Sequence, residues 1–425
     1  MSTPSEITLV TFEEAAAVAK IMHGPDAELL DYAVEKGTAT VQGFLSNILR
    51  VSVRVKVGQQ EVESKFIVKR QPVLEAQQKM TEEFGVFEHE IGVLEQCLPL
   101  LLARRPDLPV VRCYLADAAR SVIYMEDLKE SGFTSLVRNI VDLKDTVLQM
   151  PHLEVAMRTL AAFHAASVGV NWLQRFPHIF TEDIFFEKND GAVMRNCIEQ
   201  GVRSILRPIA RHHFQNDAAT LEAVEWIASD DFYRTVTAIC KHDTTNAAVN
   251  VLCHGDSWAN NMMFKLDPES GDPLQVKLID FQISRYAPGN RDLVYCIYMV
   301  CTAEFRKQHE KELLQTYWQA LSDACPEGPG QTWDEFYADY DRIRPFGLMV
   351  AATMRPAIYI EGAVPVGEEE LTEEQITNMV EGRYDQEDII RQFENNPTFH
   401  KEMVQVIEEA AQIYRDHKQR HLKSE

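Results

Sequence analysis

The chain contains two short stretches that decide its fold, CHGDSWANN at residues 253–261 and VKLIDFQ at 276–282. The turn-forming residues between them predict a hairpin of two antiparallel strands. Because Asn261 begins the first strand and Asp280 closes the second, antiparallel pairing brings both to the same end of the hairpin. That end lies beside the loop that carries Asp256. The sequence therefore predicts three oxygen-bearing side chains around one point.

These side chains suit a hard divalent cation. An amide and a carboxylate beside a second carboxylate favour Mg²⁺, whereas Zn²⁺ prefers His or Cys ligands. Asp256, five residues before Asn261, is then placed to accept a hydroxyl proton as a general base. The reaction class that follows is transfer of a γ-phosphoryl group to an alcohol. The alternative is a turn in which Asp256 and Asn261 only cap backbone groups, and His254 is expected to brace the loop.

The rest of the chain predicts two units of different character, 1–127 and 128–425. The first contains a helix begun by a capping box at 11–14, a hairpin at 48–57 and 62–69, a helix at 73–102, and strands at 110–115 and 121–125. The second is mostly helical around the hairpin, with expected helices at 153–167, 190–201, 221–241 and 292–311. We therefore expect an α+β fold with two lobes.

Composition narrows the class of partner. The 425 residues include 65 acidic and 42 basic ones, a formal charge of -23, which opposes binding to nucleic acid. An anionic substrate such as ATP would need Mg²⁺ and local positive groups. The sequence shows neither an export signal nor an apolar membrane span, and its eight cysteines form no CxxC pair. We expect a cytoplasmic protein with reduced thiols.

Together, these motifs resemble the ecdysteroid kinase-like family, also called CHK kinase-like, of the aminoglycoside and choline kinase group. HGDSWANN and KLIDFQ carry the resemblance most clearly. FIVK at 66–69 is similar to the strand with the family's phosphate-binding lysine, and FEHEI at 87–91 to the helix with its partner. Glu126-Asp127-Leu128 resembles the linker between lobes. The resemblance implies a protein-kinase-like fold and an enzyme that uses ATP and Mg²⁺.

The resemblance also implies roles for individual residues. Lys69 would contact the α and β phosphates, and Glu90 would orient Lys69. Helix geometry alone does not choose Glu90, because Glu83 and Glu95 lie on the same flank of the apolar stripe. The remaining implied roles are adenine binding by the main chain near Glu126, Asp127 and Leu128, proton acceptance by Asp256, and Mg²⁺ binding by Asn261 and Asp280.

The sequence departs most from a kinase pattern in the loop expected to cover the nucleotide. Residues 37–47 lack the dense glycine spacing that lets backbone approach phosphates closely. Gly43-Phe-Leu-Ser46 nevertheless resembles the family's version of this turn, which implies nucleotide contacts from Gly43 and Ser46. Gln282 replaces the glycine of the Asp-Phe-Gly triplet of protein kinases, which fits the small-molecule family and argues against an activation-loop switch.

The leading function is a kinase that phosphorylates a small-molecule alcohol. The resemblance implies an ecdysteroid or another lipophilic alcohol as the acceptor. One rival is a nucleotide-binding pseudoenzyme or scaffold that acts through a protein partner, and its support is the glycine-poor loop. A protein kinase is a further possibility, opposed by the lack of a His-Arg-Asp loop and an Ala-Pro-Glu motif. The sequence leaves the oligomeric state open.

Overall fold

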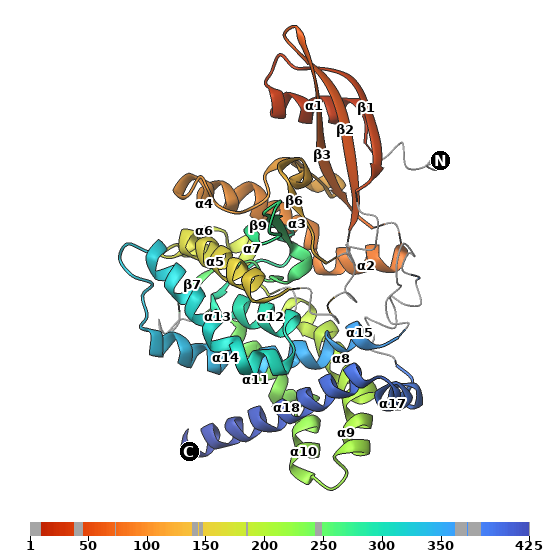
Figure 1. The fold of residues 1–425 in the computed structure, drawn as a ribbon, viewed down its shortest axis with the longest axis vertical. Coiled ribbons are helices and arrows are strands. Elements are labelled where there is room, and N and C mark those ends of the chain that lie inside the picture. Colours follow the sequence, from red (N-terminus) through yellow and green to blue (C-terminus); the bar gives the residue numbers. More distant parts are fainter. Residues whose placement is uncertain are drawn as a thin grey trace.

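The computed structural model describes residues 10–37, 46–72, 74–137, 143, 148–183, 186–242, 249–361, 372 and 384–424. It divides into a β-sheet part and a larger, mostly helical part (Figure 1). The two-lobed α+β architecture expected from the sequence is confirmed.

The smaller part is an antiparallel sheet with the strand order β1-β2-β3-β5-β4. Its strands are β1 (Glu28–Lys36), β2 (Asn47–Val57), β3 (Gln60–Arg70), β4 (Cys113–Asp117) and β5 (Val122–Glu126). The predicted hairpin is β2–β3, which pairs Val57 with Gln60 across the turn. Strand β1 was not predicted. It lies at the edge of the sheet and only Leu29 is buried, so its sequence lacks the alternation that marks a half-buried strand.

Helix α1 (Phe12–His23) covers one face of this sheet, and its predicted capping box is present. The backbone N–H of Thr11 donates to Glu14 at 2.7 Å, and that of Glu14 donates to the Thr11 hydroxyl at 3.2 Å. Alternate residues of β2 point toward the helix. The small core between them includes Ala15, Val18, Ala19, Leu49, Val51, Val53 and Val55.

The single helix expected at 73–102 is interrupted. It consists of α2 (Glu75–Phe84), α3 (Val86–Gly92), the π-helical turn η2 (Val93–Cys97) and α4 (Leu98–Arg104). Gly85 ends α2 in the left-handed region, with a φ of 64°, which favours glycine. The break separates α2 from α3, which carries Glu90 and contacts β3 through it.

The core of the helical part is made by α5 (Met150–Ser167), α12 (Asn290–Val300), α13 (Ala303–Ala324) and α14 (Trp333–Thr353). Helix α5 packs on α13, and α12 packs on α14. The helix expected at 292–311 is therefore two helices. Thr302 separates them because its side chain accepts a hydrogen bond from the N–H of Phe305 and begins α13.

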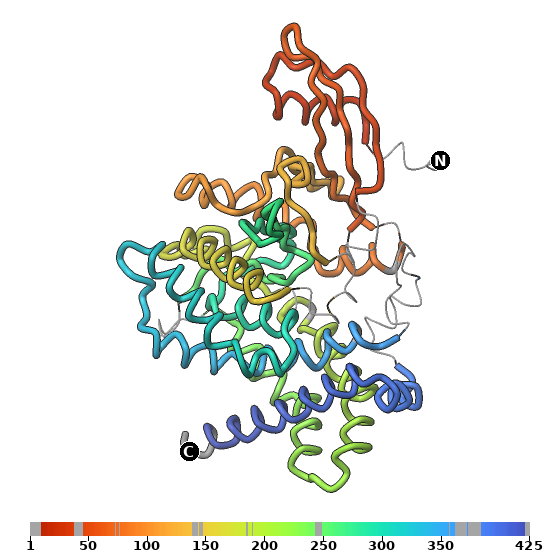
Figure 2. Tube along the Cα trace, in the orientation of Figure 1, coloured from red at the N-terminus to blue at the C-terminus, as the bar shows by residue number. Residues whose placement is uncertain are grey.

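The chain has further helices and helical turns. They are η3 (Ala118–Arg120), η4 (Leu128–Ser131), α6 (Trp172–Arg175), α7 (Pro177–Phe180), η6 (Lys188–Gly191), α8 (Ala192–Gly201), η7 (Val202–Leu206), α9 (Arg207–His213), α10 (Ala218–Ile227), α11 (Asp230–Cys240), η8 (Ala259–Asn261), α15 (Pro356–Tyr359), α17 (Gln386–Asn395) and α18 (Pro397–Ser424). Ser229 caps α11 and splits the helix expected at 221–241. Helix α18 crosses the end of the molecule farthest from the sheet, beside α10 and α17 (Figure 2).

Short strands lie where the two parts meet. They are β6 (Phe133–Thr134), β7 (Asn250–Cys253), β8 (Met262–Leu266), β9 (Pro273–Leu278) and β10 (Arg285–Pro288). Strands β8 and β9 form the predicted antiparallel hairpin, with Met262 opposite Leu278. Strand β10 pairs with β7. The loop between β7 and β8 is therefore fixed at both ends by strand pairing.

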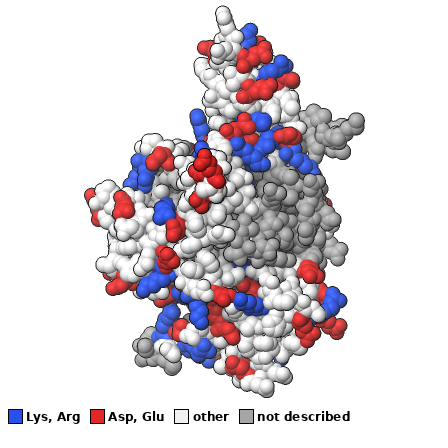
Figure 3. Space-filling view, viewed as in Figure 1, with Lys and Arg blue, Asp and Glu red and all other residues white. Residues whose placement is uncertain are grey.

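On the face shown in Figure 3, acidic and basic side chains are interspersed over both parts of the molecule. Among the described residues, no helix combines the length and the apolar character needed to cross a bilayer.

Candidate active site

The loop between β7 and β8 depends on a glycine for its shape. Gly255 has a φ of 88°, a value that side-chain-bearing residues rarely adopt. A Cβ atom at this position would lie 2.0 Å from the carbonyl oxygen of Ile283. Only glycine therefore lets the loop pass this close to the segment that follows Asp280.

Asp292, in the first turn of α12, holds the backbone of this loop. Its carboxylate accepts from the N–H groups of His254 at 2.6 Å and Gly255 at 2.8 Å, and lies 3.0 Å from Nε2 of His164. Burial alone would raise the pKa of Asp292, but these donors and the His164 ring lower it. Asp292 is fully buried and is a structural anchor of the loop.

His254 braces the loop, as predicted. Its Nδ1 accepts from the N–H of Asp256 at 3.2 Å, so Nε2 carries the proton and donates to the carbonyl oxygen of Ile279 at 2.9 Å. The imidazole thus ties the loop to the end of β9.

Asp256 has a donor on each carboxylate oxygen. The Tyr295 hydroxyl donates to Oδ1 and the Asn261 amide Nδ2 to Oδ2, both at 2.7 Å. Burial raises the pKa of Asp256, and the charge of Asp280 adds to the rise, while both hydrogen bonds oppose it. Because the amide nitrogen of Asn261 faces Asp256, its amide oxygen is the atom directed elsewhere.

Asn261 and Asp280 lie at the same end of the β8–β9 hairpin, as predicted. The N–H of Ile279 donates to the carbonyl oxygen of Asn261 at 3.0 Å and joins the two segments. Asp280 has a φ of 67°, in the left-handed region that Asp enters more readily than most residues. The turn directs its carboxylate to Lys69, with Oδ1 2.8 Å from Nζ.

The structure pairs Lys69 with Glu90. Lys69 Nζ lies 2.6 Å from Oε2 of Glu90, and both side chains are at most 2% exposed. The other oxygen of Glu90 accepts from the N–H of Phe281 at 3.2 Å. Burial alone would lower the pKa of Lys69, but the carboxylates of Asp280 and Glu90 raise it, so the ammonium is charged. Among the three glutamates left open by the sequence, Glu90 makes this contact.

A cavity of about 390 Å³ lies between the sheet and the β8–β9 hairpin. Apolar side chains including Ile48, Ile67, Met125 and Met263 form part of its wall. The predicted site residues that line it are Ser46, Lys69, Glu90, Glu126, Asp127, Leu128, Asn261 and Asp280. Asp256 is not one of the lining residues, but it accepts a hydrogen bond from Asn261, which is. Gly43 lies outside the described residues.

The side chains of the linker residues have protein partners. The Arg50 guanidinium lies 2.7 Å from the Asp127 carboxylate, and Lys277 Nζ lies 2.6 Å from that of Glu126. Arg50, on β2, was not among the predicted site residues, because one basic residue in an alternating strand carries no signal of its partner.

Tyr295 was also missed. It lies three residues after Asp292 on α12, so both side chains lie on one face of the helix. Asp292 contacts the backbone of the loop between β7 and β8, while Tyr295 contacts the Asp256 side chain. The i, i+3 spacing is the signal that could have revealed it once Asp292 was placed at the loop.

The donor set fits Mg²⁺. The carboxylate of Asp280 and the amide oxygen of Asn261 are hard oxygen ligands, and they face a cavity with room for phosphates. The Lys69 ammonium contacts both Glu90 and Asp280. This single positive charge faces the carboxylates of Glu90 and Asp280, with that of Asp256 nearby, and the excess of negative charge favours binding of a cation beside them.

Comparison with known proteins is consistent with this geometry. The model of the ecdysteroid kinase-like family matches residues 40–327, more than half of the chain. No curated protein is significantly similar in sequence.

Several solved structures resemble the chain at low identity. One is an ethanolamine kinase from Plasmodium vivax, with 13% identity, coverage of 88% of this chain and 84% of that one, and a TM-score of 0.43. A choline kinase from Streptococcus pneumoniae has 16% identity, coverage of 86% and 93%, and a TM-score of 0.37. The GDP complex of aminoglycoside 2'-phosphotransferase-IIIa has 11% identity, coverage of 94% and 99%, and a TM-score of 0.40. On the evidence of the family match, the chain belongs to the ecdysteroid kinase-like family.

Proposed function

We propose that the chain transfers the γ-phosphoryl group of ATP to the hydroxyl of a small-molecule alcohol. Membership of the ecdysteroid kinase-like family supports a small-molecule kinase. The observation that carries the proposal is the cavity in which Lys69 reaches Asp280, with Asn261 linking the cavity to Asp256. In this proposal residues 1–127 bind the nucleotide, and 128–425 hold the catalytic loop and the acceptor.

The nucleotide would occupy the cavity with its base between apolar side chains such as Ile48 and Ile67. The backbone of residues 126–128 would donate to and accept from the adenine ring. Lys69, held by Glu90, would contact the α and β phosphates. Ser46, together with Gly43, would cover the phosphates. Each contact uses a group that lines the cavity, apart from Gly43, for which the resemblance alone is the support.

The transfer step would use Asp256 as the proton acceptor. The acceptor oxygen attacks the γ-phosphorus, its proton passes to Asp256, and the bond from phosphorus to the oxygen bridging to ADP breaks. Asn261 and Asp280 would hold Mg²⁺, which when bound offsets negative charge on the phosphates. The chain itself supplies position and electrostatic stabilisation, which dominate catalysis in this class of reaction.

The proposed acceptor is a steroid alcohol such as an ecdysteroid, or another lipophilic alcohol. Support for a steroid alcohol comes from membership of the ecdysteroid kinase-like family. Asp256 is placed to serve any hydroxyl brought within hydrogen-bond reach, so its geometry does not select one alcohol.

The test is a transfer assay with γ-labelled ATP, Mg²⁺ and a panel of alcohols that includes ecdysteroids. Asp256→Asn keeps the shape of the side chain but removes its capacity to accept the proton, and we expect turnover to fall by roughly 10²- to 10⁴-fold. The matched control is Asp267→Asn, because Asp267 lies in the exposed turn between β8 and β9. It should retain wild-type turnover.

Two results would count against the proposal. Equal turnover of the Asp256→Asn and wild-type proteins would show that Asp256 is not the proton acceptor. Stabilisation by ATP with Mg²⁺, without transfer to any alcohol in the panel, would favour the nucleotide-binding scaffold instead.

A further inference from the structure

Helix α12 contacts the catalytic loop through two side chains on successive turns. Asp292 accepts from the backbone of His254 and Gly255 and so fixes the path of the loop. One turn later, the Tyr295 hydroxyl donates to Oδ1 of Asp256 at 2.7 Å. The first contact positions the loop, and the second reaches the carboxylate that the proposed reaction uses.

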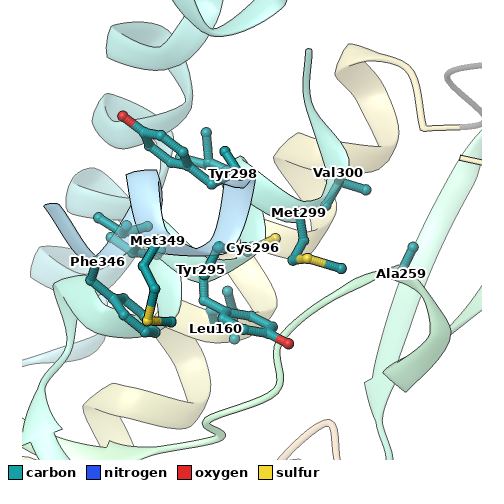
Figure 4. Close-up of a cluster of buried hydrophobic side chains, with 14 of the residues drawn as sticks. Leu160, Ala259, Tyr295, Cys296, Tyr298, Met299, Val300, Phe346 and Met349 are labelled. Carbon is teal, nitrogen blue, oxygen red and sulfur yellow. The ribbon is translucent and has the colours of Figure 1, made fainter. Parts of the chain in front are cut away.

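The Tyr295 side chain is itself held in place. It is 7% exposed, and its ring stacks on Phe346 with centroids 6.1 Å apart and an interplanar angle of 25°. Burial and the neighbouring Asp256 carboxylate raise the pKa of Tyr295 well above its usual value, so the hydroxyl remains a donor. In Figure 4 the hydroxyl groups of Tyr295 and Tyr298 point in different directions, and that of Tyr295 faces the chain leading to Ala259.

The second oxygen of Asp256 is held from another element. Asn261, at the start of the β8–β9 hairpin, donates to Oδ2 at 2.7 Å. The terminal torsion of an aspartate side chain is otherwise soft, because its carboxylate rotates over a broad range. Two donors from separate elements therefore define the plane of the carboxylate.

We infer that Tyr295 is a positioning residue that sets the orientation of the Asp256 carboxylate toward the acceptor hydroxyl. This inference rests on the proposed function, because it assumes that Asp256 accepts the proton. Tyr295 does not line the nucleotide cavity. Its loss should therefore affect the transfer step and leave nucleotide binding unchanged.

The first measurement compares Tyr295→Phe with Tyr298→Phe at saturating acceptor. Tyr298 is the matched control because it is buried on the same helix and its hydroxyl donates to Glu409, away from the site. We expect Tyr295→Phe to lower kcat by roughly 10- to 100-fold, since small errors in position are costly in oriented catalysis. The KM for ATP and the thermal stabilisation by ATP with Mg²⁺ should stay within about twofold of wild type. Tyr298→Phe should keep the wild-type kcat.

The second measurement is a double-mutant cycle in single-turnover conditions. If Tyr295 acts through the Asp256 carboxylate, adding Tyr295→Phe to Asp256→Asn should slow transfer by less than about twofold. A merely structural role would instead multiply the two losses.

The outcomes separate this inference from the proposed function. Transfer that is lost in Asp256→Asn but unchanged in Tyr295→Phe overturns the role of Tyr295 alone. Equal losses in Tyr295→Phe and Tyr298→Phe, or multiplied losses in the cycle, also overturn it. Absence of transfer by the wild-type chain overturns the proposed function and this inference together.

Discussion

Two of the regions that contain buried charged side chains differ in how the charges are paired. We call Arg306 and Glu310 of α13, Arg344 of α14, Arg355 at the start of α15, and Glu402 and Glu409 of α18 the C-terminal ion cluster; Arg344 and Glu409 are partly buried and the other four are buried. In it, each carboxylate contacts a guanidinium, as in the pairs Arg355–Glu402 at 2.8 Å and Arg344–Glu310 at 2.5 Å. Arg306 pairs with Glu409. The three guanidinium groups thus each have a glutamate partner, and Arg344 also contacts Asp341, whose side chain is 44% exposed.

The candidate active site is not balanced in this way. Lys69 faces both Glu90 and Asp280, and Asp256 accepts from a hydroxyl and an amide rather than from a cation. Asp256 and Asp280 are partly buried, and withdrawing carboxylates from water without a matching cation costs free energy. Paired strands, the loop glycine and Asp292 nevertheless hold this part of the chain in place. The arginines of the C-terminal ion cluster therefore find their partners within the protein, while the excess of carboxylates at the candidate active site fits the divalent cation of the proposed function.

The largest effect should follow from removing one of the unmatched carboxylates. Asp280→Asn should reduce phosphoryl transfer by more than about 10⁴-fold, because the divalent cation loses its charged ligand. Its unfolding free energy should change by at most about 1 kcal/mol, since Lys69 keeps Glu90 as a partner. A transfer assay and a urea titration measure the two quantities. An active Asp280→Asn protein would contradict the contrast between the regions.

The opposite pattern is expected in the C-terminal ion cluster. Arg355→Met leaves Glu402 buried without its guanidinium, and the free energy of unfolding should fall by about 3–5 kcal/mol. The kcat of the folded protein should not change. Arg158→Met, which breaks an exposed pair with Glu154, is the control and should cost at most about 0.5 kcal/mol. Denaturant titration of both variants measures the free energies of unfolding. A similar loss in the two would show that burial of the ion pair does not increase its contribution to stability.

Ligand binding should also distinguish the candidate active site from the C-terminal ion cluster. ATP with Mg²⁺ at one hundred times its Kd should stabilise the wild-type protein by about 2.7 kcal/mol. Arg355→Met should retain this increment although it starts from a lower stability, while Asp280→Asn should lose most of it. Thermal unfolding with and without Mg²⁺ measures the increment. An equal increment in Asp280→Asn would argue against a metal ligand at this position.

The smallest effect concerns His89, next to Glu90 on α3. Burial, with a contribution from Arg285, lowers the pKa of His89 to about 4, and its Nε2 lies 2.6 Å from the carbonyl oxygen of Ser284. The unfolded chain therefore binds a proton near pH 6.5 that the folded chain binds only near pH 4. Stability contributed by the neutral ring is complete above pH 6.5 and is lost as the pH falls toward 4, by roughly 1–3 kcal/mol.

His89→Gln removes the titrating group and keeps a hydrogen-bond donor. As the pH falls from 6.5 to 4, the unfolding free energy of the wild type should therefore decrease relative to that of His89→Gln. A difference that does not change with pH would show that His89 titrates normally in the folded chain.

Local sequence was sufficient for the features that depend on neighbours along the chain. The alternation of β2 and β3 predicted their hairpin, and Thr11 with Glu14 predicted the start of α1. The CHGDSWANN and KLIDFQ stretches predicted that Asn261 and Asp280 meet, because antiparallel pairing of two adjacent strands leaves few arrangements. Helix boundaries were less certain. Thr302 and Ser229 divide helices that periodicity alone joined, since the apolar pattern continues across both caps.

Tertiary structure decided which distant side chains meet. Glu83, Glu90 and Glu95 are equivalent along the sequence, and only packing of α3 against the sheet brings Glu90 within 2.6 Å of Lys69. The contacts of Tyr295 with Asp256 and of Arg50 with Asp127 join residues 39 and 77 positions apart. Periodicity specifies the buried face of an element but not the neighbour that it meets. Local sequence therefore specifies which chemical groups are available, and the packing of separate elements specifies which of them share a site.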